Sequence, residues 1–227
     1  MIFSSGRKRL LISSFVSMLF PPVCGICKKK INQKYTCEKC SNILQYTMKR
    51  ELCVRNIGYD VDQLISLFLY QGVIRNCILE LKFDGKAYIA NTFAQLMGMA
   101  FKRSHFEADI VVPVPIHRKR LMERGYNQSE LLSRIIAKQL KMTHLSHLLV
   151  KVKNNVAQST LDHAHRKENV SNVYRMNQKF NICGKRILLI DDIYTTGATA
   201  NECAKVLKEN GAQEVICLTI AYAGSSR

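Results

Sequence analysis

Two adjacent carboxylates and a hydroxyl-rich turn follow one another in the segment KRILLIDDIYTTGATA, residues 185–200. Asp191 and Asp192 come directly after the apolar run 187–190, which is typical of a strand buried on both faces of a parallel sheet. We expect the acids at the carboxyl edge of that sheet, where ligands bind in open α/β folds. A helical pattern that ends at Gly211 follows the turn, so backbone N–H groups and a helix N-terminus would face a phosphate. The acids would face hydroxyls or a cation. The turn comprises Thr195, Thr196, Gly197, Ala198 and Thr199.

A cluster of cations follows a second predicted strand in DIVVPVPIHRKRLMERGYNQSE, residues 109–130. The strand should end at Pro115, and Ser129 is a plausible N-cap for the helix that follows. A basic loop at the carboxyl end of a parallel strand would point its charges at the same crevice as the two acids, which predicts an anion site. Its cations are Arg118, Lys119, Arg120 and Arg124.

Four cysteines are spaced as metal ligands. Cys24 and Cys27 form one Cys-x-x-Cys pair, Cys37 and Cys40 form another, and nine residues separate the two. Four thiolates complete a tetrahedral zinc site, so we expect structural Zn²⁺ here. An iron–sulfur cluster and a chance arrangement are the alternatives. Five basic residues adjoin the site and would offset the negative charge of the thiolates: Lys28, Lys29, Lys30, Lys34 and Lys39.

The order of the predicted elements indicates an α/β fold. Residues 1–55 hold an apolar stretch and the paired cysteines, residues 56–106 read as a helical linker segment that includes LISLFLYQ, and residues 107–227 alternate strands and helices. Asp84-Gly85 predicts a turn between two of these segments. The polar, weakly periodic stretch 151–181 predicts an active-site flap or a short hairpin.

Charge and hydropathy restrict the class of partner and the location. The chain has 34 basic and 17 acidic residues among 227, a net charge of +17, which favours a polyanionic partner. LLISSFVSMLF after three basic residues imitates a signal peptide, but it has no small-residue cleavage site and is too short to span a bilayer. We expect it to form a short helix docked on the core. No transmembrane segment and a reducing, cytoplasmic location are therefore predicted.

LLIDDIYTTGATA resembles the 5-phosphoribosyl-1-pyrophosphate (PRPP) motif of type I phosphoribosyltransferases. The resemblance implies that Asp191 and Asp192 hold the ribose hydroxyls and that the turn 195–199 wraps the 5′-phosphate. It also implies that the cations of 118–124 hold the pyrophosphate together with Mg²⁺.

The whole chain resembles the ComF family of competence proteins, which join an N-terminal zinc ribbon to a phosphoribosyltransferase-like domain of parallel strands flanked by helices. The resemblance implies a role in natural transformation, with single-stranded DNA handled in the cytoplasm or at the inner face of the membrane, beside other DNA-uptake proteins that include a helicase-like partner. The matching pieces are FPPVCGICKK, CEKC, LKFDGK, VVPVPIHRKRLMERGYNQSELL and a block with Gln158, Leu161, Arg166 and Asn169.

Two further hypotheses stay open beside that one. The chain could be a metabolic phosphoribosyltransferase for a nucleobase, with the zinc ribbon as a structural module, although Thr195 stands where purine enzymes carry a base-contacting acid. It could also be a PRPP-sensing regulator of duplex DNA, but no helix-turn-helix pattern is found. Because a loop committed to pyrophosphate cannot also hold DNA phosphates, we assign single-stranded DNA mainly to Lys28, Lys29, Lys30 and Lys34.

Overall fold

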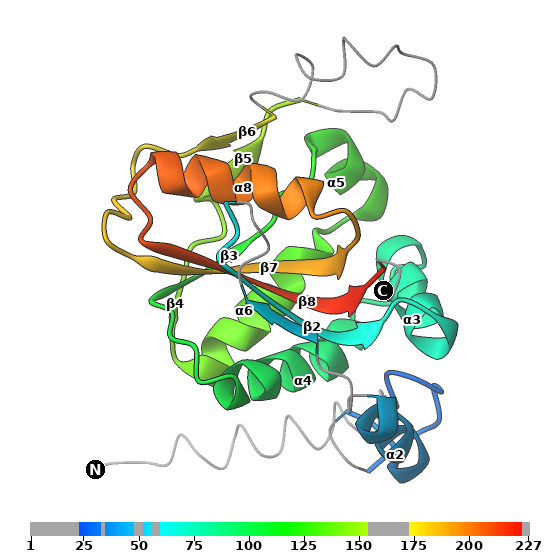
Figure 1. The fold of residues 1–227 in the computed structure, drawn as a ribbon. Helices are drawn as coiled ribbons and strands as arrows, with labels where there is room; N and C mark the ends of the chain where they lie inside the picture. The colour runs from blue at the N-terminus through cyan, green and yellow to red at the C-terminus, as the bar shows by residue number, and fades with distance from the viewer. Residues whose placement is uncertain (1–22, 33–34, 48–51, 56–59, 154–172, 224–227) are drawn as a thin grey trace, which may run out of the picture. The chain divides into compact units, whose positions relative to one another are not determined.

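The computed structural model describes residues 23–32, 35–47, 52–55, 60–153 and 173–223 (Figure 1). Lys34, the expected N-terminal apolar helix and the block from Gln158 to Asn169 lie outside the described residues. The contacts of the chain divide it into two units, Met1–Thr47 and Met48–Arg227, which are described separately below.

The first unit is a small turn and helix around the paired cysteines. Val23 and Lys30 pair as an isolated antiparallel bridge that closes the turn carrying the first two cysteines. The helix α2 (Glu38–Thr47) begins directly after the third cysteine. Ile26, Ile31 and Leu44 are buried, so the described residues of this unit contribute a very small apolar core. A core of that size rarely folds without a metal or a disulfide.

The second unit is built on a six-stranded sheet with the order β1-β2-β8-β7-β3-β4. All neighbours from β2 to β4 are parallel, and β1 pairs with β2 in the antiparallel sense. This parallel sheet confirms the predicted α/β class. The strands are β1 (Leu52–Arg55), β2 (Gln63–Leu69), β3 (Ile110–Pro113), β4 (Thr143–His144), β7 (Arg186–Tyr194) and β8 (Glu214–Tyr222).

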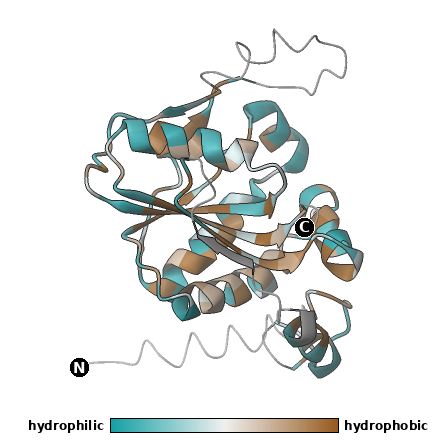
Figure 2. Cartoon of the chain, viewed as in Figure 1, coloured by the Kyte–Doolittle hydropathy of each residue, from teal (hydrophilic) through white to brown (hydrophobic). Residues whose placement is uncertain are grey.

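Helices cover both faces of this sheet. The helices α4 (Ile89–Arg103) and α6 (Gln128–Leu140) lie on one face, and α8 (Ala198–Glu209) lies on the other (Figure 1). The outward side of α8 is mostly hydrophilic, as expected for a helix that covers a sheet (Figure 2). Two further helices, α3 (Gly72–Phe83) and α5 (Arg118–Arg124), follow the carboxyl ends of β2 and β3.

A short antiparallel hairpin, β5 (Leu149–Lys151) with β6 (Tyr174–Met176), stands outside the main sheet. The two strands lie at the ends of the polar stretch 151–181, and residues 154–172 between them are outside the described residues, so the choice between a flap and a short hairpin stays a prediction. The turn predicted at Asp84-Gly85 is confirmed, since Gly85 lies between α3 and α4 with φ +67°.

The alternation of side chains along β7 determines where its acids point. Ile187 and Leu189 lie in the core cluster that α8 covers, so Leu188 and Ile190 face α4 and α6. The same alternation directs Asp191 to the α8 face and Asp192 to the opposite one.

Three local predictions are wrong. Residues 63–69, assigned to a helical segment, form β2, because a short apolar run that is buried on both faces has no periodicity that separates strand from helix. The basic stretch 118–124 is the helix α5 rather than a loop, and its N-cap is His117. Asn127, not Ser129, is the N-cap of α6, and its side chain accepts a hydrogen bond from the Ser129 N–H.

None of the helices within the described ranges is long and apolar enough to cross a membrane.

Candidate functional site

Asp191 and Asp192 lie where the sheet opens on the β3 side. The pairing of β7 with β3 ends at Ile190, which faces Pro113, whereas the pairing of β7 with β8 continues to Tyr194. The two acids therefore border a gap in the sheet next to β3, which ends earlier than β8. Ligands bind in such a crevice at the carboxyl edge of open α/β sheets.

Asp191 is held by two hydrogen bonds and has an unusual pKa. Its Oδ1 accepts from the Ser129 hydroxyl at 3.0 Å and from the Asp192 N–H at 2.9 Å. Burial, together with the negative charge of Asp192, raises its pKa to about 7, although Lys82 and the hydrogen bonds oppose the rise. A carboxyl group of this kind changes its charge readily when a cation or a hydroxyl donor arrives.

Asp192 forms an ion pair with Lys82, the penultimate residue of α3. The Nζ–Oδ1 distance is 3.0 Å, and the side chains of Lys82 and Asp192 are 19% and 4% exposed. The buried Oδ2 of Asp192 accepts no hydrogen bond from any residue that the structure describes. A buried carboxylate oxygen without a donor lowers the stability of the fold by about 1–3 kcal/mol. This oxygen can therefore accept a hydrogen bond from a bound ligand.

The turn after β7 forms a small cavity with Asp191. Its volume is about 50 Å³, and its walls include Thr195, Thr196, Gly197 and Thr199. Gly197 has φ +78°, and a Cβ there would lie 2.1 Å from the Tyr194 hydroxyl oxygen, so only glycine fits this turn. The helix α8 begins at the next residue, so its first N–H groups adjoin this cavity.

Three consecutive residues at the end of α3 connect the separate sequence blocks of the site. The Leu81 carbonyl accepts a hydrogen bond from the Tyr126 hydroxyl, Lys82 pairs with an acid of β7, and Phe83 lies under the Arg124 guanidinium. The distance from the guanidinium carbon to the ring centroid is 4.8 Å. The LKFDGK block therefore holds both the RGYNQ block and the acids of β7.

The predicted pyrophosphate cations take different positions. Arg118, Lys119 and Arg120 are exposed on α5, while Arg124 is partly buried and donates to Gln128 Oε1 at 3.2 Å. Burial, with the neighbouring Arg120, lowers the pKa of Arg124.

One more cation, Lys151 of β5, lies near the site. Its Nζ is 5.2 Å from the Tyr174 ring centroid. Burial and the charge of Arg120 lower its pKa, while Asp191 acts in the opposite direction. Lys151 is therefore within electrostatic range of both Arg120 and Asp191.

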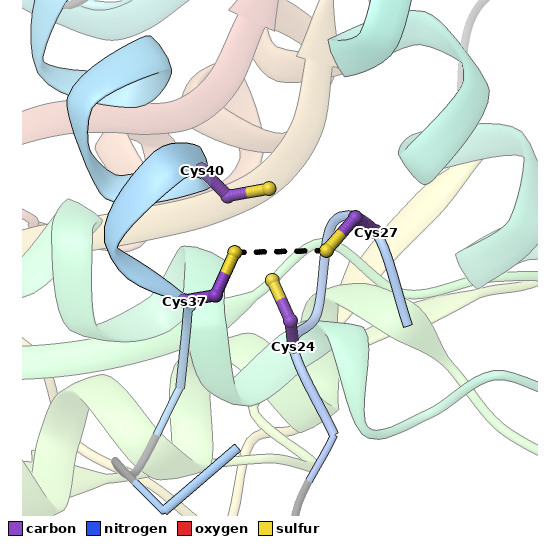
Figure 3. Close-up of side chains that lie close together, drawn as sticks. All are labelled: Cys24, Cys27, Cys37 and Cys40. Atoms are coloured by element: carbon purple, nitrogen blue, oxygen red, sulfur yellow. Dashed lines mark hydrogen bonds between the residues drawn. The ribbon is translucent and has the colours of Figure 1, made fainter. Parts of the chain in front are cut away.

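The four cysteines converge on one point (Figure 3). Their sulfur atoms all lie within 4.8 Å of one another, and the Cys27 and Cys37 sulfurs are 3.6 Å apart. Sulfurs about 2.3 Å from a tetrahedral zinc ion would be about 3.8 Å apart, so the cluster fits Zn²⁺. Burial would raise the pKa of Cys24, but hydrogen bonds from the backbone, including the Cys27 and Cys37 N–H groups, lower it to about 7.

Sequence reasoning missed Lys82, Lys151 and the link from Ser129 to Asp191. The LKFDGK block draws attention to Lys82 as part of a family motif, but the sequence does not show which acid pairs with this lysine. Lys151 has no local signal. Among the proposed DNA contacts, Lys28, Lys29 and Lys30 are exposed on the first unit.

Comparison with known proteins agrees with this geometry. Residues 127–227 match the family model described as "Phosphoribosyl transferase domain". Competence protein F of Haemophilus influenzae is 29% identical over 201 residues, which cover 85% of this chain and 87% of that protein. Competence protein ComFC of Bacillus subtilis is 29% identical over 83% of this chain and 72% of its own. DNA utilization protein YhgH of Escherichia coli is 26% identical over 87% of this chain and 91% of its own.

Solved phosphoribosyltransferases share only a loose likeness. Adenine phosphoribosyltransferase from Leishmania tarentolae aligns over 76% of this chain and 93% of its own, with 12% identity and a TM-score of 0.42. An alignment at that TM-score carries no argument, so the fold assignment rests on the sheet order and the family model. The cysteine cluster, the parallel sheet and relatives that match most of the chain together confirm the predicted resemblance: the chain is similar to competence proteins of the ComF type over most of its length, and residues 127–227 match a phosphoribosyl transferase domain.

Proposed function

We propose that this protein binds PRPP with Mg²⁺ at the edge of β7 and contributes to natural transformation by handling single-stranded DNA. The observation that supports PRPP most directly is the cavity that Asp191 shares with the turn 195–199 and with the start of α8. A 5′-phosphate there would accept hydrogen bonds from backbone N–H groups and be stabilised by the helix dipole.

The acids suit the ribose and the cation. Asp192 Oδ2 is a buried acceptor without a donor among the described residues, while Lys82 pairs with the other carboxylate oxygen, so a ribose hydroxyl could donate to Oδ2. Bound Mg²⁺ would neutralise the pyrophosphate and help it to leave if the ribose C1 carbon is attacked. Arg118, Lys119, Arg120 and Arg124 are the proposed pyrophosphate contacts, and Lys151 is an additional one.

Calorimetry with PRPP, with and without Mg²⁺, tests this site. Exchanging both Asp191 and Asp192 for Asn removes two charged acceptors, each worth about 1.5–3 kcal/mol, so the affinity should fall at least tenfold. Glu214→Gln, which removes one negative charge at the opposite end of the sheet, is the control. Equal affinity in the wild type and the double variant would exclude this site. Release of pyrophosphate, measured with and without single-stranded DNA, then decides whether phosphoribose is transferred.

The DNA part of the proposal is supported by the names of the relatives and by charge. The net charge is +17, and Lys28, Lys29 and Lys30 lie exposed next to the cysteine cluster. Lys34 belongs to the same proposed contact. Each neutralised phosphate of a single strand changes the slope of log affinity against log salt by roughly −0.7, so replacing the three lysines 28–30 by alanine should flatten the slope by about two units.

PRPP affinity should stay unchanged in that variant, because its substitutions lie in the other unit. An unaltered salt slope would mean that these lysines only balance the charge of the thiolates. We place this activity inside the cell, beside the other DNA-uptake proteins, including a helicase-like partner.

A further inference from the structure

An open cleft lies between the end of α3 and the helix α5, beside the ion pair of Lys82 and Asp192. Its volume is about 770 Å³, and its walls include Tyr70, Lys82, Phe83, Arg120 and Arg124. Both helices follow carboxyl ends of strands, so the cleft is on the same side of the sheet as the acids of β7 (Figure 1). Arg120 and Arg124, which are proposed PRPP contacts, line one wall of this cleft. The aromatic side chains of the other wall have no role in PRPP binding.

Phe83 is the main feature of that wall. Its side chain is 65% exposed, although it ends a helix whose buried residues, including Ile78 and Leu81, face the core. The Arg124 guanidinium lies over the ring at 4.8 Å from its centroid. Because a guanidinium covers only one face of a ring, the high exposure of Phe83 means that an aromatic surface is open to solvent in the cleft.

The charges of the cleft suit an anionic chain. Lys82, Arg120 and Arg124 are opposed within the lining by only one acid, Glu123. A phenylalanine among arginines is the arrangement that single-stranded nucleic acids use, since bases stack on the ring while phosphates pair with the cations. A duplex hides the faces of its bases, so an exposed ring selects unpaired strands.

We propose that the cleft between α3 and α5 binds single-stranded nucleic acid, with one unpaired base stacked on Phe83. The proposal rests on the proposed function for its ligand class and adds a base-contacting site to the backbone contacts of the lysines 28–30. The Lys82 ion pair lies in the same wall, so the stacked base would be next to the acids that are proposed to hold ribose.

The absence of tryptophan from the chain makes a direct test available. Phe83→Trp introduces a single indole at the proposed stacking position, and Met122→Trp introduces one at a position of α5 that is 77% exposed and outside the lining of the cleft. Titration with a 15-residue oligothymidylate should quench the fluorescence of Phe83→Trp and leave that of Met122→Trp nearly unchanged. Quenching of both to the same extent, or of neither, would overturn the proposal.

Affinity measurements complete the test. By fluorescence anisotropy, Phe83→Ala should bind the labelled oligothymidylate roughly tenfold more weakly with the same salt slope, and Phe83→Tyr should bind like the wild type. An abasic strand of equal length should bind the wild type and Phe83→Ala alike. Phe83 is largely exposed, so its replacement leaves no core cavity, and a thermal melt checks the fold of each variant.

The possible outcomes distinguish a failure of the stacking site from a failure of the proposed DNA-handling function. If the wild type does not bind the oligothymidylate at all, both fail. If it binds and Phe83→Ala binds equally well, the stacking site is wrong while the DNA-handling function stands. If free thymidine quenches Phe83→Trp as strongly as the same concentration of bases in the strand, the cleft is a nucleoside site and the proposal also fails.

Discussion

Removing the charge of Asp191 should stabilise the protein at neutral and alkaline pH. Burial and the Asp192 carboxylate raise the pKa of Asp191 from 3.8 to about 7, so the folded state holds this proton more tightly than the unfolded state. The stability associated with the proton is fully present below the ordinary pKa and is lost as the pH rises from about 4 to about 7. Asp191→Asn cannot ionise, and its Oδ1 can still accept from Ser129.

The size of the effect follows from the shift. Roughly three pKa units at about 1.36 kcal/mol each give a ceiling of about 4 kcal/mol. Asp191 is partly exposed through the mouth of the turn cavity, so water and salt screen its charge, and we expect about half of that ceiling. A gain of about 2 kcal/mol corresponds to a rise in Tm of about 4–8 °C for a unit of this size.

The assay is thermal unfolding of wild type and Asp191→Asn at pH 5 and at pH 8. The stabilisation should be full at pH 8 and about one third as large at pH 5, because most of the loss in the wild type occurs between these values. Asp109→Asn is a control of opposite sign: Arg186 lowers the pKa of Asp109 below its ordinary value of 3.8, so its replacement should destabilise the protein by nearly the same amount at pH 5 and at pH 8, both of which lie above that value. An Asp191→Asn variant that is no more stable than the wild type at pH 8, or equally stabilised at both pH values, would refute the reasoning.

Three other substitutions test separate parts of the structure. Cys40→Ser should lower the zinc content from one ion per chain towards zero, measured by elemental analysis, and should make the first unit sensitive to protease, because structural zinc supplies folding energy; full zinc in the variant would contradict the site. Gly197→Ala should cost at least about 1 kcal/mol in urea unfolding and weaken PRPP binding, because its φ is +78° and a tyrosine hydroxyl occupies the space of the new Cβ. Gly184 has a similar φ but open space around an added Cβ, so Gly184→Ala should lower the free energy of unfolding by less. Equal losses of stability in the two variants would contradict the steric argument. Lys82→Met should shift the pH profile of PRPP binding upwards in calorimetry, because Lys82 lowers the pKa of Asp191; an unchanged profile would show that the ion pair does not tune the site.

The parts of the site that the sequence predicted are those whose partners are local. The acids of β7, the turn that ends at Thr199 and the helix after it follow one another within a single segment, and the cysteine pairs are short motifs. Hydrophobic runs and turn residues are sufficient to position such features. The site roles of these residues stay predictions, while the elements that carry them are confirmed.

The parts that could not be predicted depend on partners distant in sequence. Ser129 reaches Asp191 across 62 positions, and Lys82 meets Asp192 from a different helix. No periodicity encodes such pairs, since the sheet order decides which strand ends and helix ends become neighbours. β2 was misassigned for the same reason, because its burial on both faces is a property of the tertiary structure.

The contacts at the end of α3 also restrict where an extra residue can be inserted in this chain. The side chains of Lys82 and Phe83 point in different directions, because successive residues of a helix are about 100° apart, and Leu81 contributes its backbone carbonyl, so each of the three residues meets a different partner. One residue inserted earlier in α3 would rotate all three together, separate the tyrosine, the acid and the arginine from their partners, and move the stacking ring out of the cleft. A single-residue insertion there should therefore be far more harmful than a point substitution at any of the three positions, whereas the same insertion at the exposed turn of Gly184 should be tolerated.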